Sequence, residues 1–372
     1  MNNNFKYHVG DWVEVRTKEE ILRTLDGNGQ LDGMPFMPEM VQHCGKRFRV
    51  HKSAHKTCDY STQFPNRTRK LEDTIHLETR CSGEAHDGCQ SGCLFYWKNA
   101  WLKPAAGPGE TLVEISPAKA ISGESSECTE ARLSECTRVA DSPDPASPIY
   151  ICQTTEIPKA TTPLSSWDIG QYIEDYRSGN VPFKRLVTGF IYSMYYFVSN
   201  NRRVDSIGLG RLLRWLYNTF NPLWGGNLFP RLKGSIPVGK PTPNVTLNLK
   251  AGELVRVKSH KEILETVNTD NRNRGMSWDA ELVPYCGKTY RVLRRVDRLI
   301  DEKTSKMMEM KSPCIVLDSV VCQARYSKCR MLCPKEMYPF WREIWLERVD
   351  PAATQPEAVE SSETVGGYNR QV

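Results

Sequence analysis

The chain contains the heptapeptide CGKRFRV at residues 44–50, and it carries the same heptapeptide with two changes, CGKTYRV, at residues 286–292. The match extends backwards without a gap to Gly10 and Gly252, and 16 of the 41 aligned positions are identical. Identity at that density and at one constant offset is the signature of a duplicated structural unit. The sequence therefore predicts two copies of one module.

Each copy has the sequence pattern of a small, mainly β unit. Val13 and Val15 alternate with polar residues after a glycine, which predicts a strand leaving a turn. A short helix should follow, with Ile21 and Leu22 on its apolar face. The Cys-Gly-Lys step predicts a tight turn into the next strand, because glycine supplies the backbone freedom that such a turn needs.

This order of glycine, strand, loop, Gly-Lys turn and strand resembles SH3-like small barrels of the kind that carry KOW motifs. The C-terminal stretch CPKEMYPFWREIWLERV, residues 333–349, also resembles uncharacterised bacterial proteins with duplicated Cys-rich modules of this type. That group has no known activity to carry over. The expected fold class is α+β, mainly β, with two SH3-like small barrels, each with a four-cysteine metal site, joined by a partly helical insert.

Composition divides the chain into five expected segments. The stretch between the copies is first rich in Pro, Ser and Thr, which is typical of a linker, and then rich in basic and aromatic residues. The segments are residues 1–104, the first Cys-rich SH3-like repeat; 105–165, a Pro/Ser-rich linker; 166–245, a basic aromatic helical insert; 246–350, the second repeat; and 351–372, a disordered tail.

The 13 cysteines favour metal binding over a disulfide framework, since their number is odd and the N-terminal residues do not form a secretory signal. Four cysteines recur in both copies. Four thiolates suit tetrahedral zinc, and an iron–sulfur cluster or metal-free thiols are the alternatives. The predicted ligands of two zinc ions are Cys44, Cys81, Cys89 and Cys93 in the first copy, and Cys286, Cys322, Cys329 and Cys333 in the second. The roles of Cys58, Cys128, Cys136, Cys152 and Cys314 stay open.

Two duplicated acids and two histidines lie near these cysteines. Glu39 and its counterpart Glu281 are expected to pair with the lysines of the Gly-Lys turns. His43 and His86 are interpreted as ordinary surface histidines, because four thiolates leave a zinc ion no open position for catalysis.

No common catalytic motif for phosphate binding, acyl transfer or metal-dependent proteolysis is present. Cys58 beside His55 is a candidate nucleophile and base, although the sequence shows no orienting acid. A biosynthetic enzyme with a cleft between the repeats is the second alternative, with unknown catalytic residues.

Residues 181–240 contain nine Lys or Arg and one acid, so this stretch alone exceeds the net charge of +6 of the whole chain. Apolar residues at helical spacing predict amphipathic helices over 183–198 and 209–220. Three roles are open for these helices. Their apolar faces could pack on the barrels or lie in a membrane surface, or their basic and aromatic side chains could bind nucleic acid. The residues expected at a membrane or partner surface are Lys184, Arg185, Arg202, Arg203, Arg211, Arg214, Trp215 and Trp224.

Together these patterns predict a zinc-stabilised binding or adaptor protein whose insert docks to a membrane surface or a protein partner. A nucleic-acid-binding protein is the alternative, and a small-molecule substrate is not evident. The longest nearly apolar stretch, residues 186–198, is shorter than the roughly 18 to 20 residues that a membrane-spanning helix needs. A cytoplasmic location, or one at the inner face of a membrane, is therefore expected.

Overall fold

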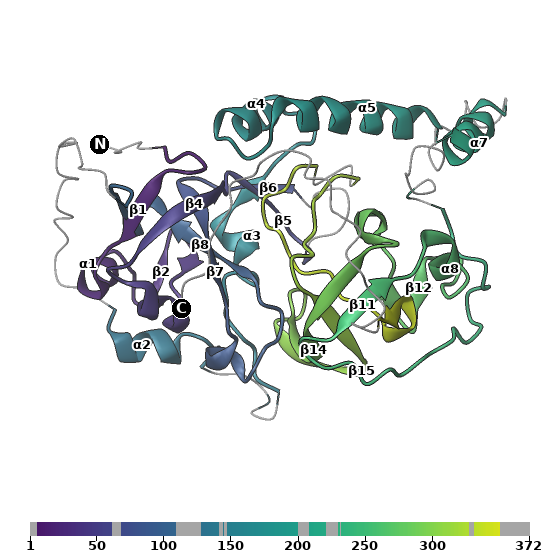
Figure 1. The fold of residues 1–372 in the computed structure, drawn as a ribbon. Helices are drawn as coiled ribbons and strands as arrows, with labels where there is room; N and C mark the ends of the chain where they lie inside the picture. The colour runs from purple at the N-terminus through teal and green to yellow at the C-terminus, as the bar shows by residue number, and fades with distance from the viewer. Residues whose placement is uncertain are drawn as a thin grey trace.

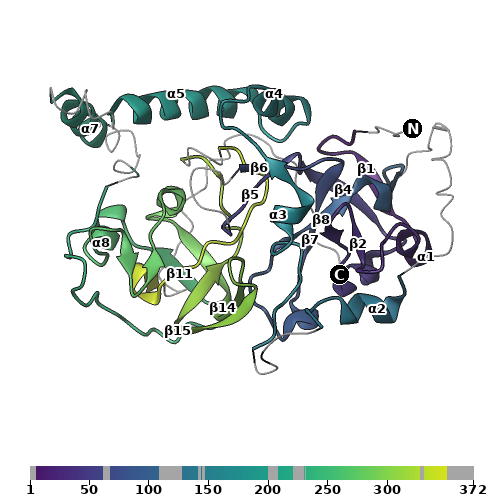
Figure 2. The same ribbon diagram turned by 180° about the vertical axis from the view of Figure 1, so that it is seen from behind.

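The structure is a computed structural model and describes residues 6–61, 68–108, 128–140, 144, 147–199, 208–220, 230, 232–326 and 331–349. Within these residues the chain is a mixed α+β protein with more strand than helix, and two curled antiparallel sheets form half-barrels (Figure 1). A row of helices lies along one side of the molecule and extends over both half-barrels. This arrangement is seen from the front and from the back (Figures 1 and 2). The predicted tail lies outside the described residues.

The first half-barrel has the strand order β8-β7-β4-β1-β9. Its strands are β1 (Trp12–Val15), β4 (Arg47–Ser53), β7 (Thr74–Arg80), β8 (Leu94–Lys98) and β9 (Leu102–Pro104). A separate sheet of β5 (Lys56–Cys58), β6 (Thr68–Lys70) and β10 (Thr162–Pro163) extends from it. The remaining elements of this half are α1 (Lys18–Leu22), β2 (Gln30–Leu31), β3 (Met34–Pro35), η1 (Pro38–His43), η2 (Glu84–His86), η3 (Asn99–Trp101), α2 (Glu130–Glu135) and α3 (Ile157–Ala160).

The second half-barrel has the strand order β15-β14-β11-β16. Its strands are β11 (Leu254–Val257), β14 (Thr289–Asp301), β15 (Lys306–Leu317) and β16 (Leu346–Arg348). The other elements of this half are α8 (His260–Leu264), β12 (Arg272–Asn273), β13 (Met276–Ser277), η5 (Ala280–Tyr285) and η6 (Glu343–Trp345). The antiparallel pair β14 and β15, a long hairpin, corresponds to the antiparallel pair β4 and β7 of the first half.

Equivalent residues of the two copies occupy equivalent positions in the two sheets. Val13 lies opposite Phe48 in the first half-barrel, and Val255 lies opposite Tyr290 in the second. The Cys-Gly-Lys turns also agree, because Gly45 and Gly287 have φ angles of 73° and 77°. A side chain at either position would be strained, so both turns require glycine.

Two tryptophans lie in the core of each half, and one of each pair makes the same hydrogen bond in both copies. Trp97, Trp101, Trp341 and Trp345 are all fully buried. The indole N–H of Trp101 donates to the hydroxyl of Thr24 at 3.1 Å, and that of Trp345 donates to Thr266 at 2.9 Å. Each of these two rings therefore anchors its core with its polar atom satisfied. The other pair differs, because the indole N–H of Trp97 donates to Thr79 at 3.0 Å while that of Trp341 is buried without a hydrogen-bond partner in the described residues.

Three helices form the row along the side of the half-barrels: α4 (Gly170–Arg177), α5 (Phe183–Ser199) and α7 (Leu209–Phe220). The helices predicted over 183–198 and 209–220 are therefore confirmed. No helix in the described ranges combines the length and the apolar character needed to cross a bilayer.

A fully buried ion pair attaches α4 to the first half. The ammonium of Lys56 lies 2.5 Å from a carboxylate oxygen of Asp175, and both side chains have no exposed surface. Lys56 also donates to Gln171 on α4 and, at 2.9 Å, to the carbonyl of Met331 in the C-terminal segment. Burial lowers the pKa of Lys56, and Asp175 opposes that shift. One side chain thus joins three distant parts of the chain.

Replacing Lys56 by alanine is expected to lower the free energy of unfolding by about 3–5 kcal/mol, because Asp175 would remain buried without its ammonium partner. Lys70 is the matched control, since it pairs with Lys56 across β5 and β6 but forms an exposed ion pair with Glu72. Lys70→Ala should change the stability by less than about 1 kcal/mol. Urea denaturation measures both, and equal losses would contradict the structural role of Lys56.

The core of the first half holds a histidine that should make its stability pH-dependent. His76 is fully buried and donates from Nδ1 to the carbonyl of Phe95 at 2.9 Å. Burial lowers the pKa of His76 from 6.5 to about 4. Between those two values the unfolded chain binds a proton that the folded chain does not, so stability falls as the pH falls through this window.

The variant His76→Asn keeps a donor for Phe95 but removes this titration. The wild type should therefore lose up to about 3 kcal/mol of stability relative to the variant as the pH drops from 7 to 4. Urea midpoints measured across that range test the prediction. His8→Asn on the surface is the control, and a pH profile that His8→Asn flattens as much as His76→Asn does would argue against the assignment.

Candidate functional site

Three of the four cysteines predicted in the first copy line one small cavity. Cys81, Cys89 and Cys93 surround a volume of about 40 Å³, and Cys152 from the segment before α3 joins them. Burial raises the pKa of the Cys93 thiol to about 12 and raises those of Cys81 and Cys152. In the absence of an ion, burial therefore favours the neutral thiol form of Cys81, Cys93 and Cys152.

Cys44 has different neighbours from these cysteines. It ends η1 at the Gly-Lys turn, and the charged groups acting on it are Glu19, Lys18 and Glu130. Burial raises the pKa of its thiol to about 11. Cys286 ends η5 in the same backbone conformation and packs into the core of the second half. Neither cysteine lines the cavities described here, and their role as ligands stays a prediction.

Next to the first cavity, Glu39, Cys81 and His86 form a group whose ligand atoms lie within 4.8 Å of one another. It is the one group of three or more possible ligands at that spacing in the described part of the chain. Glu39 Oε1 lies 3.8 Å from the sulfur of Cys81 and 4.0 Å from Nδ1 of His86. The other carboxylate oxygen of Glu39 is buried without a hydrogen-bond partner.

The orientation of His86 suits a metal ligand. Its Nε2 lies 3.0 Å from the carbonyl of Ile151, and this contact requires the proton to sit on Nε2. The lone pair of Nδ1 then faces Glu39 and Cys81. A metal-binding histidine usually donates its other ring N–H to such a carbonyl, which fixes the tautomer and the ring. The expectation that His86 is a surface histidine is wrong, because only 1% of its side chain is exposed.

Glu39 and Glu281 accept hydrogen bonds from the backbone of the loops that follow Cys81 and Cys322. Glu39 accepts the backbone N–H of Ala85 at 3.1 Å, and Glu281 accepts those of Arg325 and Tyr326 at 2.7 and 2.6 Å. In the described residues neither acid forms the expected ion pair with Lys46 or Lys288, which are exposed. The turn and the acid are therefore separate features, and the acid holds the loop that carries the cysteines.

A second group of thiols lies at the contact between the halves. Cys58 of the first half, with Cys322 and Cys333 of the second, lines a cavity of about 10 Å³. The thiols of Cys58 and Cys333 are close enough to form a hydrogen bond, which with burial raises the pKa of Cys333. Cys329, the fourth predicted cysteine of this copy, lies outside the described residues.

A buried ion pair separates the two cysteine cavities. The ammonium of Lys335 lies 2.9 Å from Glu302 and 3.4 Å from the carbonyl of Cys58. Burial disfavours this charge, but Glu302, Tyr96 and the nearby thiols together raise the pKa of Lys335. Glu302 itself lines the first cavity. The ammonium therefore provides a positive charge beside both groups of sulfur atoms.

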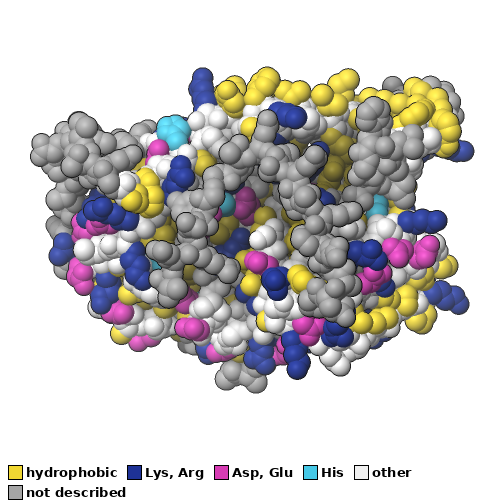
Figure 3. All heavy atoms as spheres, viewed as in Figure 1, with side chains coloured by type: hydrophobic (Ala, Val, Ile, Leu, Met, Phe, Trp, Pro, Cys, Tyr) yellow, Lys and Arg dark blue, Asp and Glu magenta, His cyan; other side chains and the backbone are white. Residues whose placement is uncertain are grey.

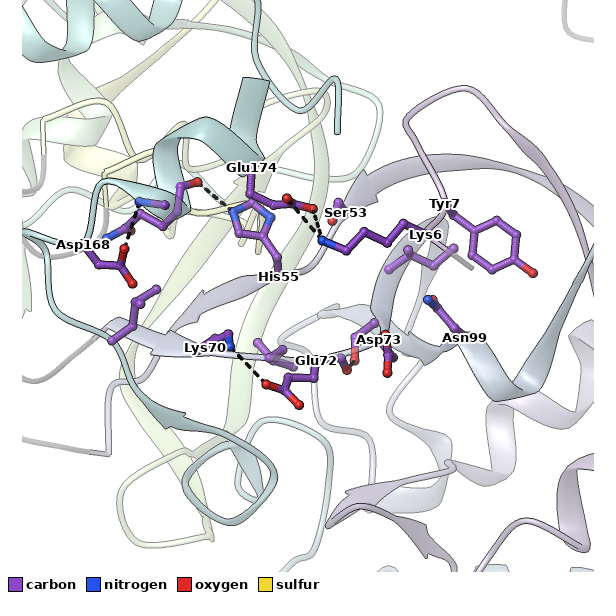
Figure 4. Close-up of a pocket in the computed structure, with 16 residues that line it drawn as sticks. Lys6, Tyr7, Ser53, His55, Lys70, Glu72, Asp73, Asn99, Asp168 and Glu174 are labelled. Carbon is purple, nitrogen blue, oxygen red and sulfur yellow. Dashed lines mark hydrogen bonds and ion pairs between the residues drawn. The ribbon is translucent and has the colours of Figure 1, made fainter. Parts of the chain in front are cut away.

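A wider cavity, of about 510 Å³, is polar and lies between the first half and α4 (Figure 4). His55 faces it, with Nε2 at 3.2 Å from both Asp175 and the carbonyl of Gln171. Cys58 lines the cavity that Cys322 and Cys333 also line, so Cys58 and His55, the candidate nucleophile and base, line different cavities. Lys6 also lines this cavity and forms an ion pair with Glu174 of α4 (Figure 4).

The helices α4, α5 and α7 leave a large apolar face uncovered. Hydrophobic side chains follow the outer edge of the helix row in the space-filling view (Figure 3). Ile191 and Met194 have exposed fractions of 62% and 71%. The other large exposed apolar residues of these helices are Ile173, Tyr176, Phe183, Val187, Phe190, Phe197, Leu209, Leu212, Trp215 and Phe220, and Trp167 and Ile169 are exposed just before α4.

The helices that carry this apolar face also carry basic residues. Lys184 on α5 and Arg211 on α7 are exposed, while Arg214 is half-buried. Arg185 is half-buried and donates to the carbonyl of Gln323 at 2.7 Å, so it attaches α5 to the second half. Of the residues expected at this surface, Arg202, Arg203 and Trp224 lie outside the described residues.

No family model, curated protein or solved structure matches this chain.

Proposed function

We propose that this chain is a zinc-stabilised binding protein that docks to an anionic membrane surface through the outer face of α4, α5 and α7. The observation that carries the proposal is the size of the exposed apolar face on these helices. Soluble monomers rarely expose so many large hydrophobic residues together, and such patches mark binding surfaces. The two half-barrels, which we regard as SH3-like, would then be held at the membrane to bind a further partner.

The chemistry of the face favours a membrane surface over other partners. Aromatic and aliphatic side chains occupy the outer edge, and Lys184 and Arg211 are placed to reach lipid phosphates. An interfacial helix combines an apolar face with basic residues in this manner. Packing of the apolar faces on the half-barrels would leave this outer edge unexplained, because the space-filling view shows hydrophobic side chains along the side of the helix row that is turned away from the half-barrels (Figure 3). Binding of nucleic acid would use the basic residues but leave the aliphatic ones in water.

The first zinc ion would be bound by Cys81 and His86, with Glu39 in reach and further thiols lining the same cavity. Thiolate and imidazole are the ligands that zinc prefers. A small half-barrel buries little apolar surface, so an ion that joins η1, η2 and the end of β7 would add stability to the fold.

The variant Met194→Glu should reduce binding to vesicles of phosphatidylcholine and phosphatidylglycerol by about tenfold or more, since burying a methionine contributes roughly 1.5–3 kcal/mol. Flotation of the full chain with these vesicles measures the bound fraction. The matched control is Met308→Glu on β15, where an exposed methionine lies outside the helix face. It should bind as the wild type does.

A salt series separates the membrane from the alternative partner. Vesicle binding should persist at high salt, because the apolar contribution is not screened, whereas binding to nucleic acid falls steeply. Failure of the wild type to float, or equal effects of Met194→Glu and Met308→Glu, would overturn the proposal. Tight, salt-sensitive binding to single-stranded nucleic acid in its place would favour the alternative.

The variant His86→Ala should lower the zinc content of the purified chain by about one ion and reduce its thermal stability, because the ligand and its contact with Ile151 are both lost. Elemental analysis and thermal unfolding measure the two effects. His43→Ala is the control, since His43 packs against Phe48 and Phe95 and lies outside the ligand group. Zinc loss in His43→Ala but not in His86→Ala would contradict the assignment.

A further inference from the structure

A metal site shared by the two halves accounts for the second group of thiols. We propose that Cys58, Cys322 and Cys333 bind a second zinc ion, so that a ligand from the first half completes a site in the second. This inference goes beyond membrane docking and does not depend on it. The duplicated sequence predicts a different site, which contains Cys286 and no residue of the first half.

The placement of Cys58 carries the argument. It ends β5, and its side chain packs with Ala324 and Cys333 in a cluster that belongs to neither core. Cys322 packs against the same cluster. The cavity that these three cysteines line is small, and Lys335, Glu336 and Met337 line it as well. Three thiols that converge from distant segments on one cavity form a donor set with the softness that zinc prefers.

The charge around this cavity suits an ion bound by thiolates. Three thiolates and one Zn²⁺ carry a net negative charge, which is costly to bury without compensation. The buried ammonium of Lys335 contacts the backbone of Cys58, and the buried ammonium of Lys56 acts electrostatically on Cys333. Two positive charges therefore stand beside the site.

Binding an ion requires a small adjustment of the side chains. The three sulfurs are not all within 4.8 Å of one another, unlike the ligand atoms of Glu39, Cys81 and His86. Rotation of the cysteine side chains toward the cavity would close that gap, and zinc binding would release the thiol protons to solvent. The ion would then join β5 of the first half directly to the C-terminal segment of the second.

The test compares two cysteines of the full chain that are equally buried. Cys58→Ser should reduce the zinc content from about two ions to about one, because a ligand of the shared site is lost. Cys286→Ser should retain about two ions, because Cys286 lies in the core of the second half. Far-UV circular dichroism checks that each variant is folded.

The opposite pattern, with zinc lost in Cys286→Ser and kept in Cys58→Ser, would overturn the proposal in favour of the repeat-based site. A zinc content that Cys58→Ser leaves unchanged, or a disulfide between Cys58 and Cys333 in the wild type, would also overturn it. Vesicle flotation of the same samples tests membrane docking, so the failure of either proposal can be told from the failure of the other.

If Cys58→Ser does not fold, the wild type itself provides the measurement. Alkylation of Cys58 and Cys333, mapped by mass spectrometry, should rise on addition of a zinc chelator, while that of Cys314 should stay low. Cys314 is fully buried on β15, opposite Val296 of β14, and lies outside the cluster. Alkylation of Cys58 that does not respond to the chelator would refute the shared site.

Discussion

The arrangement of this molecule depends on the burial of one charged group, the ammonium of Lys56. A charge without access to water is tolerated only where partners surround it. Those partners come from α4, through Asp175 and Gln171, and from the C-terminal segment, through the carbonyl of Met331. The first half-barrel, the helix row and the second half are therefore required to meet at a single point.

The same constraint organises the neighbouring junction. Lys335 is buried against Glu302 and the backbone of Cys58, and it separates the two cavities lined by cysteines. Charges, thiols and backbone carbonyls are concentrated where the halves meet, while the two aromatic cores lie on either side. The polar groups make the contact specific, because each has a partner that only this arrangement provides. Metal ions bound by the thiols would add to that specificity.

The row of helices α4, α5 and α7 differs from this polar junction, because much of its apolar surface is exposed. On its inner side Asp175 and Arg185 attach it to both halves, and on its outer side aliphatic and aromatic residues face solvent. A helix that is anchored by polar contacts and leaves its apolar residues outside is arranged for a second partner. The half-barrels hold α4 and α5 in place, so the outer face is presented without a change in fold.

The duplicated sequence predicted local structure well. The strands at Val13 and Val255, the Gly-Lys turns and the helices of the insert all appear, because hydrophobic periodicity and the demands of glycine act over a few residues. It also predicted that Cys81, Cys89 and Cys93, which line one cavity, belong together, but it included Cys44, which does not line that cavity. It could not identify Cys152 or Cys58 as their neighbours, since both lie outside the matched positions and only folding brings them close.

The sequence by itself determined that the chain has two related units, where their turns and strands begin, and that a basic, amphipathic insert separates them. The tertiary structure alone decided which cysteines share a cavity, that His86 is buried with Nδ1 facing Glu39, and that the apolar side of α5 faces outwards. The physical reason is that periodicity and turn chemistry are local. Burial, charge pairing and ligand grouping depend on contacts between residues such as Cys58 and Cys333, which are distant in the chain.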